Sequence, residues 1–308
     1  MVSLPQVSSA RDRSALAGIG LMLLGLFLFS VNDVMGKWLV ATYSVGQVLL
    51  LRSAAALLVL APFVLRQGIT WRLPPQPGLH ALRVVFSTLE VACFYWAVAY
   101  LPLADVTTYY LAGPIYVAAI AVFWLGESLD RRRIMTIVVG FVGVLIALRP
   151  SGATLTPPAF IALAGSIFFA LLMTTTRKLR NTSDTTLVLG QILGALAFGV
   201  AASPFSWVPP SGRDFALLSL LGVVAMLAHV CVNRSLKLAP ASVVSPYQYT
   251  LIVWAVVLGY LFFGDVVQVW TIAGAAMICA AGLALLLFER EAARARRSDV
   301  PPPVLPEA

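Results

Sequence analysis

The chain has 308 residues, of which 60% are hydrophobic and only 11% are charged, and its mean hydropathy is +0.92. Soluble domains carry about 25% charged residues, so this composition excludes an ordinary soluble domain and indicates a membrane protein. The net charge of +8 does not indicate nucleic-acid binding, because basic residues in a membrane chain act as topology signals. We therefore expect the lipid bilayer, and no nucleic acid, as a partner.

Ten apolar segments come close to the roughly 20 residues that a helix needs to cross a bilayer. In chain order they are residues 16–40, 46–65, 79–100, 104–125, 134–148, 157–176, 185–203, 213–236, 241–263 and 268–288. The first segment is too long for a signal peptide, and no small-residue cleavage site follows it. The sequence therefore predicts an all-α membrane protein with ten transmembrane helices.

Basic residues are distributed unevenly around these segments. If the N-terminus is cytoplasmic, most of the 21 Lys and Arg residues fall on the cytoplasmic side of the membrane. The positive-inside rule then predicts that both termini are cytoplasmic in a protein of the inner membrane. Residues 1–15 are predicted to be a cytoplasmic N-terminal segment, and residues 289–308 a charged, Pro-rich cytoplasmic tail.

The two halves of the chain repeat each other. The Gly-acid step at Gly126 and Glu127 returns 138 residues later at Gly264 and Asp265. The first repeat covers residues 16–150 and the second covers residues 151–288. Each contains five predicted helices, and because five is an odd number the second repeat enters the membrane from the opposite face. The pattern predicts two inverted five-helix repeats, an arrangement found in many secondary transporters.

The repeated motif is similar to that of a known transporter superfamily. Each copy is an apolar helix that ends in a Gly-acid step, ADVTTYYLAGPIYVAAIAVFWLGESL in the first half and ASVVSPYQYTLIVWAVVLGYLFFGDVV in the second. With the segment QVLLLRSAAALLVLAPF, these motifs resemble the EamA-type members of the drug/metabolite transporter superfamily over about residues 15–290. The resemblance implies a fold of ten helices in two repeats and a transport function. The second copy departs from the pattern, since Ile252 stands opposite Pro114.

Four ionisable residues stand out within the predicted helices, where insertion of each costs about 2.5–3.5 kcal/mol. Asp33 and Lys37 lie one turn apart in the first helix, Arg52 lies at a similar depth in the second, and Glu90 lies near the middle of the third. Asp33 with Lys37 or Arg52 forms either a structural ion pair or a gate or site for the charged ends of a zwitterion. Glu90 either carries protons, binds a substrate ammonium or donates a hydrogen bond to a neighbouring helix.

Aromatic and amide side chains at membrane depth form a second group of candidates, because ligand sites are mostly apolar with a few placed polar groups. The candidate substrate-binding residues are Tyr95, Trp96, Tyr109, Tyr110, Tyr247, Gln248, Tyr249, Trp254 and His229. The alternatives are an interfacial aromatic belt for the tyrosines and a packing role for the histidine. Pro114 and Pro246 are predicted to kink helices and to free backbone carbonyls that line a cavity. We expect that cavity between the first, third, fourth, sixth, eighth and ninth helices.

The sequence contains no sign of an enzyme, and we expect neither a cofactor nor a metal ion. It has no cluster of nucleophile and base, no metal-ligand spacing and no phosphate-binding GK[ST] motif. The sequence favours a secondary transporter that exports small metabolites by alternating access, with or without protons. Its aromatic content resembles that of the YddG-like amino-acid exporters, which favours neutral or aromatic amino acids as substrates. The alternatives are a multidrug or other metabolite exporter of the same fold and, less favoured, a non-transporting membrane scaffold.

Overall fold

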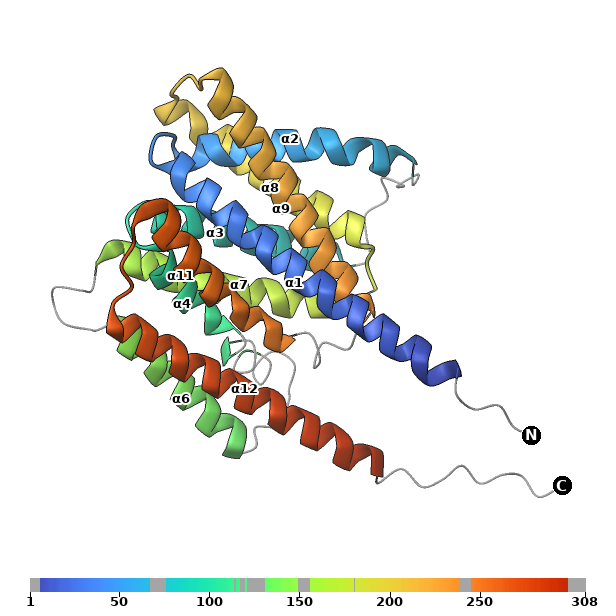
Figure 1. The fold of residues 1–308 in the computed structure, drawn as a ribbon. Helices are drawn as coiled ribbons and strands as arrows, with labels where there is room; N and C mark the ends of the chain where they lie inside the picture. The colour runs from blue at the N-terminus through green and yellow to red at the C-terminus, as the bar shows by residue number, and fades with distance from the viewer. Residues whose placement is uncertain are drawn as a thin grey trace.

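A computed structural model of the chain describes residues 6–66, 76–113, 115–116, 120, 131–148, 156–179, 181–238 and 245–298. In these ranges every regular element is a helix (Figure 1). Six of the described helices are long and apolar enough to cross a membrane, and two shorter ones are also apolar. The prediction of an all-helical membrane chain is confirmed, whereas the count of ten spans stays a prediction.

The helices follow the predicted segments closely. The first half contains α1 (Gln6–Val40), α2 (Val45–Arg66), α3 (Pro77–Val98), α4 (Leu103–Leu111) and α6 (Arg131–Leu148). The second half contains α7 (Pro157–Lys178), α8 (Asp184–Ala202), α9 (Gly212–Leu238), α11 (Thr250–Phe263) and α12 (Val269–Ser298), with short 3-10 turns η1 (Ser203–Ser206) and η2 (Ser245–Tyr249). Apolar runs of this length have no other way to satisfy their backbone hydrogen bonds in lipid.

The ends of the helices differ from the prediction in three places. α1 begins ten residues before the predicted apolar segment, and α12 continues ten residues beyond it. Both extensions are rich in Ala and Arg, which are strong helix formers, and contain neither Gly nor Pro. The predicted helix 241–263 instead begins as the 3-10 turn η2, which includes Pro246. Of the predicted helix 104–125, residues 114, 117–119 and 121–125 lie outside the described part of the chain.

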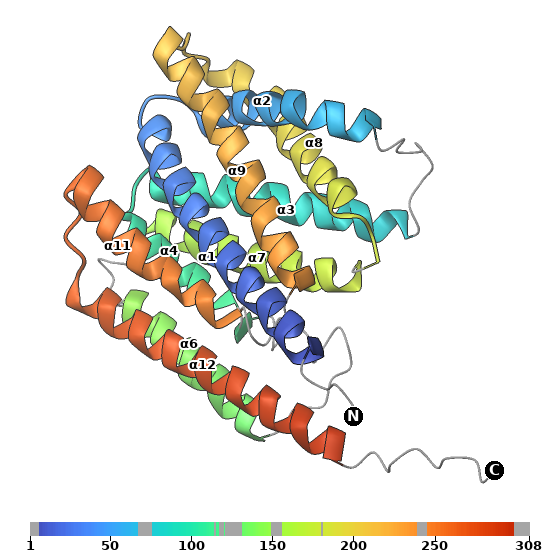
Figure 2. The same cartoon turned by 45° about the vertical axis from the view of Figure 1, so that its right-hand side comes forward.

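Helices of the first half pack mainly against helices of the second half. α1 packs on α9, α2 on α8, α3 on α7, α4 on α11 and α6 on α12. Figures 1 and 2 both show α6 and α12 side by side at one edge of the molecule, and α1 alongside α9. If each helix is exchanged for its counterpart in the other half (α1 with α7, α3 with α9, and so on), the set of pairs does not change. The two halves therefore contact each other through corresponding helices.

The outer surface of the bundle is strongly apolar. Large apolar side chains stand out from several helices, among them Leu58 on α2, Phe205 in η1, and Tyr260 and Leu261 on α11. A soluble monomer rarely exposes contiguous apolar surface of this kind. An apolar outer surface is the arrangement expected of helices surrounded by lipid.

Candidate functional site

A cavity of about 270 Å³ lies between the two halves. Its walls come from α1, α2, α3, α4, α7, α8 and α9, and from η2 with the start of α11. The helices predicted to line the cavity did not include α2 and α8, and this prediction is wrong because Arg52 and Gln191 both face the cavity. The volume is close to the lower end of the range for pockets that hold small organic ligands.

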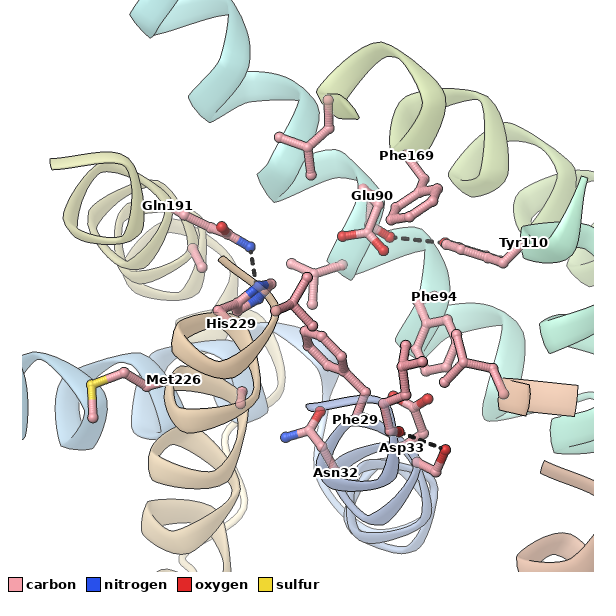
Figure 3. A pocket seen from close by; sticks show the side chains of 18 of the residues that line it. Phe29, Asn32, Asp33, Glu90, Phe94, Tyr110, Phe169, Gln191, Met226 and His229 are labelled. Carbon is pink, nitrogen blue, oxygen red and sulfur yellow. Dashed lines mark hydrogen bonds between the residues drawn. The ribbon is translucent and has the colours of Figure 1, made fainter. Parts of the chain in front are cut away.

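Two carboxylates face this cavity from different helices. Asp33 extends from α1 and Glu90 from α3 (Figure 3). Among the residues that the structure describes, neither carboxylate has a hydrogen-bond donor or an ion-pair partner. A charge removed from water without a partner is costly. These two groups therefore retain their full capacity to bind a ligand.

A chain of hydrogen bonds fixes the polar groups next to these acids. Arg52 Nη1 donates to the Tyr95 hydroxyl at 2.5 Å, and that hydroxyl donates to Asn32 Oδ1 at 3.0 Å. Asn32 Nδ2 in turn donates to the carbonyl oxygen of Leu221 on α9 at 2.8 Å. The network joins α2, α3, α1 and α9, so it holds the Arg52 guanidinium in one orientation beside the cavity.

A glycine makes this arrangement sterically possible. A Cβ atom added to Gly222 on α9 would lie 1.8 Å from the carbonyl oxygen of Arg52. α2 and α9 therefore touch backbone to backbone at the residue that carries the guanidinium. Small residues at helix contacts in membranes allow this close approach.

The wall opposite the acids is neutral and aromatic. The Gln191 amide nitrogen and His229 Nε2 are 3.2 Å apart, and the His229 ring packs edge-on against Phe29 with their centroids 4.7 Å apart. Figure 3 shows this pair on one side of the cavity and Glu90 on the other. The wall formed by Gln191, His229 and Phe29 suits an apolar or planar group of a ligand. On the side of the acids, the Phe94 and Tyr110 rings meet edge to face at 5.3 Å (Figure 3).

Of the residues predicted from the sequence to bind substrate or sense charge, some line the cavity and others do not. Those in the lining are Asp33, Arg52, Glu90, Tyr95, Tyr110, His229, Gln248 and Tyr249. Those away from it are Lys37, Trp96, Tyr109, Tyr247 and Trp254. Pro114 lies outside the described residues, and only the backbone of Pro246 is described.

The residues away from the cavity have other contacts. Trp96 is 43% exposed on the outer surface of α3, where its ring lies 6.2 Å from that of Phe198. Trp254 packs edge-on against Phe27 at 5.1 Å. Tyr109 is buried in the main core cluster, and Tyr247 packs against a small cluster around Met22.

Lys37 pairs with Asp265, the acid of the second Gly-acid step, and not with Asp33 as one interpretation of the sequence predicted. Its Nζ lies 2.5 Å from Asp265 Oδ2, at the end of α11. Asp265 also accepts a hydrogen bond from the backbone N–H of Leu103 at 3.3 Å, at the start of α4. Gly264 ends α11 with a positive φ of 65°, and this conformation directs Asp265 towards α4.

Sequence reasoning missed several polar residues in the lining. Asn32, Arg83, Gln191 and Asn233 all face the cavity. Asn32 and Gln191 interrupt apolar runs, and a polar side chain in such a run is a signal that could have identified them. Arg83 is one of the basic residues on the predicted cytoplasmic side, where the positive-inside rule alone explains its presence. The sequence therefore contained no signal that its side chain lines the cavity.

Comparisons with known proteins agree with this geometry. The model of the EamA-like transporter family matches the chain twice, over residues 16–149 and 156–288. An S-adenosylmethionine uptake transporter of Rickettsia felis is 28% identical over 282 residues, which cover 91% of this chain and 96% of that protein. The pseudopaline exporter CntI of Pseudomonas aeruginosa is 28% identical over 274 residues, covering 87% of this chain and 95% of that protein.

A riboflavin transporter of Vibrio cholerae is also similar, with 26% identity over 257 residues that cover 82% of this chain and 86% of the relative. A solved protein crystal structure aligns with a TM-score of 0.61 and 16% identity, covering 90% of this chain and 99% of that chain, which supports the fold alone. The family match extends over nearly the whole sequence and agrees with the apolar helices around a polar cavity. The chain is therefore a multi-pass membrane protein that belongs to the EamA-like transporter family.

Proposed function

We propose that this chain is a secondary transporter that exports small zwitterionic metabolites, with neutral and aromatic amino acids as the first candidates, across the inner membrane. The observation that carries the proposal is the pair of unpartnered carboxylates, Asp33 and Glu90, in one cavity beside the fixed guanidinium of Arg52. An ammonium group binds between the two acids. A carboxylate binds the N–H groups of Arg52 that the Tyr95 hydroxyl does not occupy, since a guanidinium has five.

The proposed mechanism is alternating access by ten helices in two inverted five-helix repeats. The pairing of helices between the halves supports this, because each pair has an equivalent when the halves are exchanged. Two halves that contact each other in this symmetric way can rock against each other around a central site. The first turns of α1 and the last turns of α12 lie on the same side of the molecule (Figures 1 and 2). Together with the many basic residues, this supports cytoplasmic positions for both termini.

The substrate named for one relative supports a substrate that contains an amino acid. S-adenosylmethionine is built on methionine and so carries an ammonium and a carboxylate. The similarity of this chain to its uptake transporter extends over nearly all of both proteins. One relative is named for uptake and another for export, so the outward direction proposed here requires its own test.

A second candidate is export of organic cations such as cationic drugs. The same two acids favour it, because the Phe94 and Phe169 rings that line the cavity near them would attract a desolvated cation. The two candidates differ in the need for an anionic group on the substrate. Methyl esters of amino acids retain the cation and lose the anion, so they separate the two.

The test is flux through liposomes that contain only the purified protein. Efflux and uptake of labelled phenylalanine, leucine, S-adenosylmethionine and phenylalanine methyl ester are measured with and without a pH gradient. Saturable flux of the zwitterions with weaker flux of the ester supports the proposal, and the reverse preference favours the cation exporter. If Glu90 carries the coupling proton, Glu90→Gln removes the dependence on the gradient. Absence of saturable flux for every compound in both directions would contradict the proposal.

A further inference from the structure

A buried arginine lies at a different level of the same cavity from the acids. Arg83 on α3 lines the cavity and is only 7% exposed. Its Nε donates to Thr176 Oγ1 at 2.9 Å and its Nη1 to the carbonyl oxygen of Leu187 at 3.0 Å. In the part of the chain that the structure describes, no carboxylate pairs with it and its Nη2 has no partner. A buried guanidinium without a counter-ion is costly unless a ligand supplies the anion.

The distance between the acids and this arginine follows from the helix that carries both. Arg83 and Glu90 are seven residues apart on α3, which is two turns and about 10 Å at 1.5 Å per residue. This spacing places both side chains on one face of the helix, and both lean towards its N-terminus. The cavity therefore has a negative site and a positive site about 10 Å apart.

Neutral polar groups lie between the two charged sites. On α8, Gln191 is one turn beyond Leu187, whose carbonyl oxygen binds Arg83. On α1, Phe29 is one turn before Asp33, and its ring contacts that of His229. The pair of Gln191 and His229 uses one hydrogen bond internally, which leaves amide and imidazole positions available to a ligand in the middle of the cavity.

We propose, on the basis of the function proposed above, that the preferred substrates are extended zwitterions of the size of a short peptide or an amino-acid conjugate. The cationic group binds between Asp33 and Glu90, a carboxylate binds Arg83, and amide groups between them bind Gln191 and His229. An extended chain spans about 3.3–3.6 Å per residue. A free amino acid therefore reaches only one of the two sites, whereas three residues reach both.

The probes are trialanine, trialanine amide and alanine. Trialanine amide lacks the terminal carboxylate and is otherwise nearly the same shape. Binding to the purified protein in lipid nanodiscs is measured by calorimetry. We expect trialanine to bind at least about tenfold more tightly than either of the other two, because a charge-assisted hydrogen bond is stronger than a neutral one. Equal affinity of the wild-type protein for trialanine and its amide would overturn the inference, and this comparison needs no variant.

Variants then assign the discrimination to Arg83. In Arg83→Gln the preference for trialanine over its amide is lost, and in Arg83→Lys, which keeps the charge, part of it is retained. Arg66→Gln is the matched control, because Arg66 is an exposed cation at the end of α2 and its loss leaves the preference unchanged. If Arg83→Gln still binds trialanine more tightly than its amide, Arg83 does not bind the carboxylate and only stabilises the contacts of α3 with α7 and α8.

The result separates this inference from the proposed function. If alanine and trialanine bind equally well and both need Glu90, the transporter of small zwitterions stands and the extended substrate is wrong. If no zwitterion of any length binds or crosses the membrane, both are wrong.

Discussion

Two sets of acidic groups lie within this helical bundle, and they differ in whether they are paired. Asp265 is held by Lys37 at 2.5 Å and by the backbone N–H of Leu103 at 3.3 Å. The Lys37 ammonium also lies 4.5 Å from the centre of the Phe263 ring. Asp33, one turn away from Lys37 on the same helix, has no such partner within the described residues, and neither has Glu90.

The difference separates structural charge from charge that is available to a ligand. A paired acid joins α1, α4 and α11 and has few hydrogen-bonding positions left. An unpaired acid in a cavity contributes nothing evident to helix packing and has all its acceptor positions free. Insertion of either is costly, so the acids without a stabilising partner are the ones whose presence calls for a functional explanation.

Removal of the unpaired acids tests this distinction most strongly. Asp33→Asn and Glu90→Gln should each reduce zwitterion flux by about tenfold to a hundredfold, since a hydrogen bond to a charged group contributes about 1.5–3 kcal/mol. Thermal stability in detergent should stay the same or rise, because an uncompensated buried charge is removed. Asp214→Asn, which lies outside the cavity, is the control and should keep full flux. A lower melting temperature of Asp33→Asn and Glu90→Gln, together with the loss of flux, would mean that these acids are structural.

Removal of one partner of the ion pair should have the opposite effect. Lys37→Met leaves Asp265 without its cation and should destabilise the protein by about 3 kcal/mol. Lys37→Met combined with Asp265→Leu should recover most of that loss, and a double-mutant cycle in chemical unfolding measures the coupling. Additive effects of the two substitutions would show that the pair contributes no coupling energy.

A larger residue at Gly222 should push α2 away from α9 and displace the Arg52 guanidinium, which lies beside the unpaired acids. Gly222→Ala places a methyl group against the Arg52 backbone and should destabilise the protein by about 2 kcal/mol through overpacking. It should also weaken zwitterion binding several-fold, because Arg52 is displaced from the cavity. Gly20→Ala on α1 is the control, since a Cβ there meets nothing within 4 Å. Unchanged stability in Gly222→Ala would contradict the close backbone contact of α2 and α9.

The smallest effect is expected at the loop between α1 and α2. The Tyr43 hydroxyl donates to Asp214 at 2.7 Å, and this hydrogen bond raises the pKa of Tyr43 above its usual value. A raised pKa means that the neutral hydroxyl is stabilised by folding. The contribution is therefore present below the ordinary tyrosine pKa of about 10 and is lost as the pH rises through the raised pKa.

Tyr43→Phe should accordingly lower the melting temperature slightly at pH 7. The difference between wild type and variant should stay constant up to about pH 10 and shrink above it, and a series of melting curves that begins at pH 7 and extends above about pH 10 measures it. A difference that is constant over the whole range would show that the hydrogen bond to Asp214 is not its source.

The sequence was sufficient to predict the helices but not the partners of their polar residues. Long apolar runs have one stable form in lipid, so α2, α3, α7, α8 and α9 lie where the hydropathy indicated. The partner of Lys37 is 228 residues away, and no local spacing points to it. Nearness along α1 favoured Asp33 instead.

Local sequence patterns also could not predict which side of each helix faces the cavity. Tyr95 and Trp96 are neighbours in the sequence, yet Tyr95 is 1% exposed and lines the cavity, whereas Trp96 faces outward. Both are aromatic residues in an apolar helix, and only the packing of α3 against its neighbours distinguishes them. Arg83 illustrates the same limit, because a basic residue at a helix end satisfies the positive-inside rule whether or not it faces a cavity.

The pairing of helices between the halves also has a consequence for biosynthesis. The main contacts of α1, α2, α3 and α6 are with α9, α8, α7 and α12, all of which leave the ribosome later. The first half therefore makes few contacts within itself before the second half is synthesised. The polar helix faces of the first half have no partners until the second half is inserted. A chain that stops after α6 is expected to be degraded rather than to accumulate. A gene for such a half could have yielded a stable protein only by pairing with another copy.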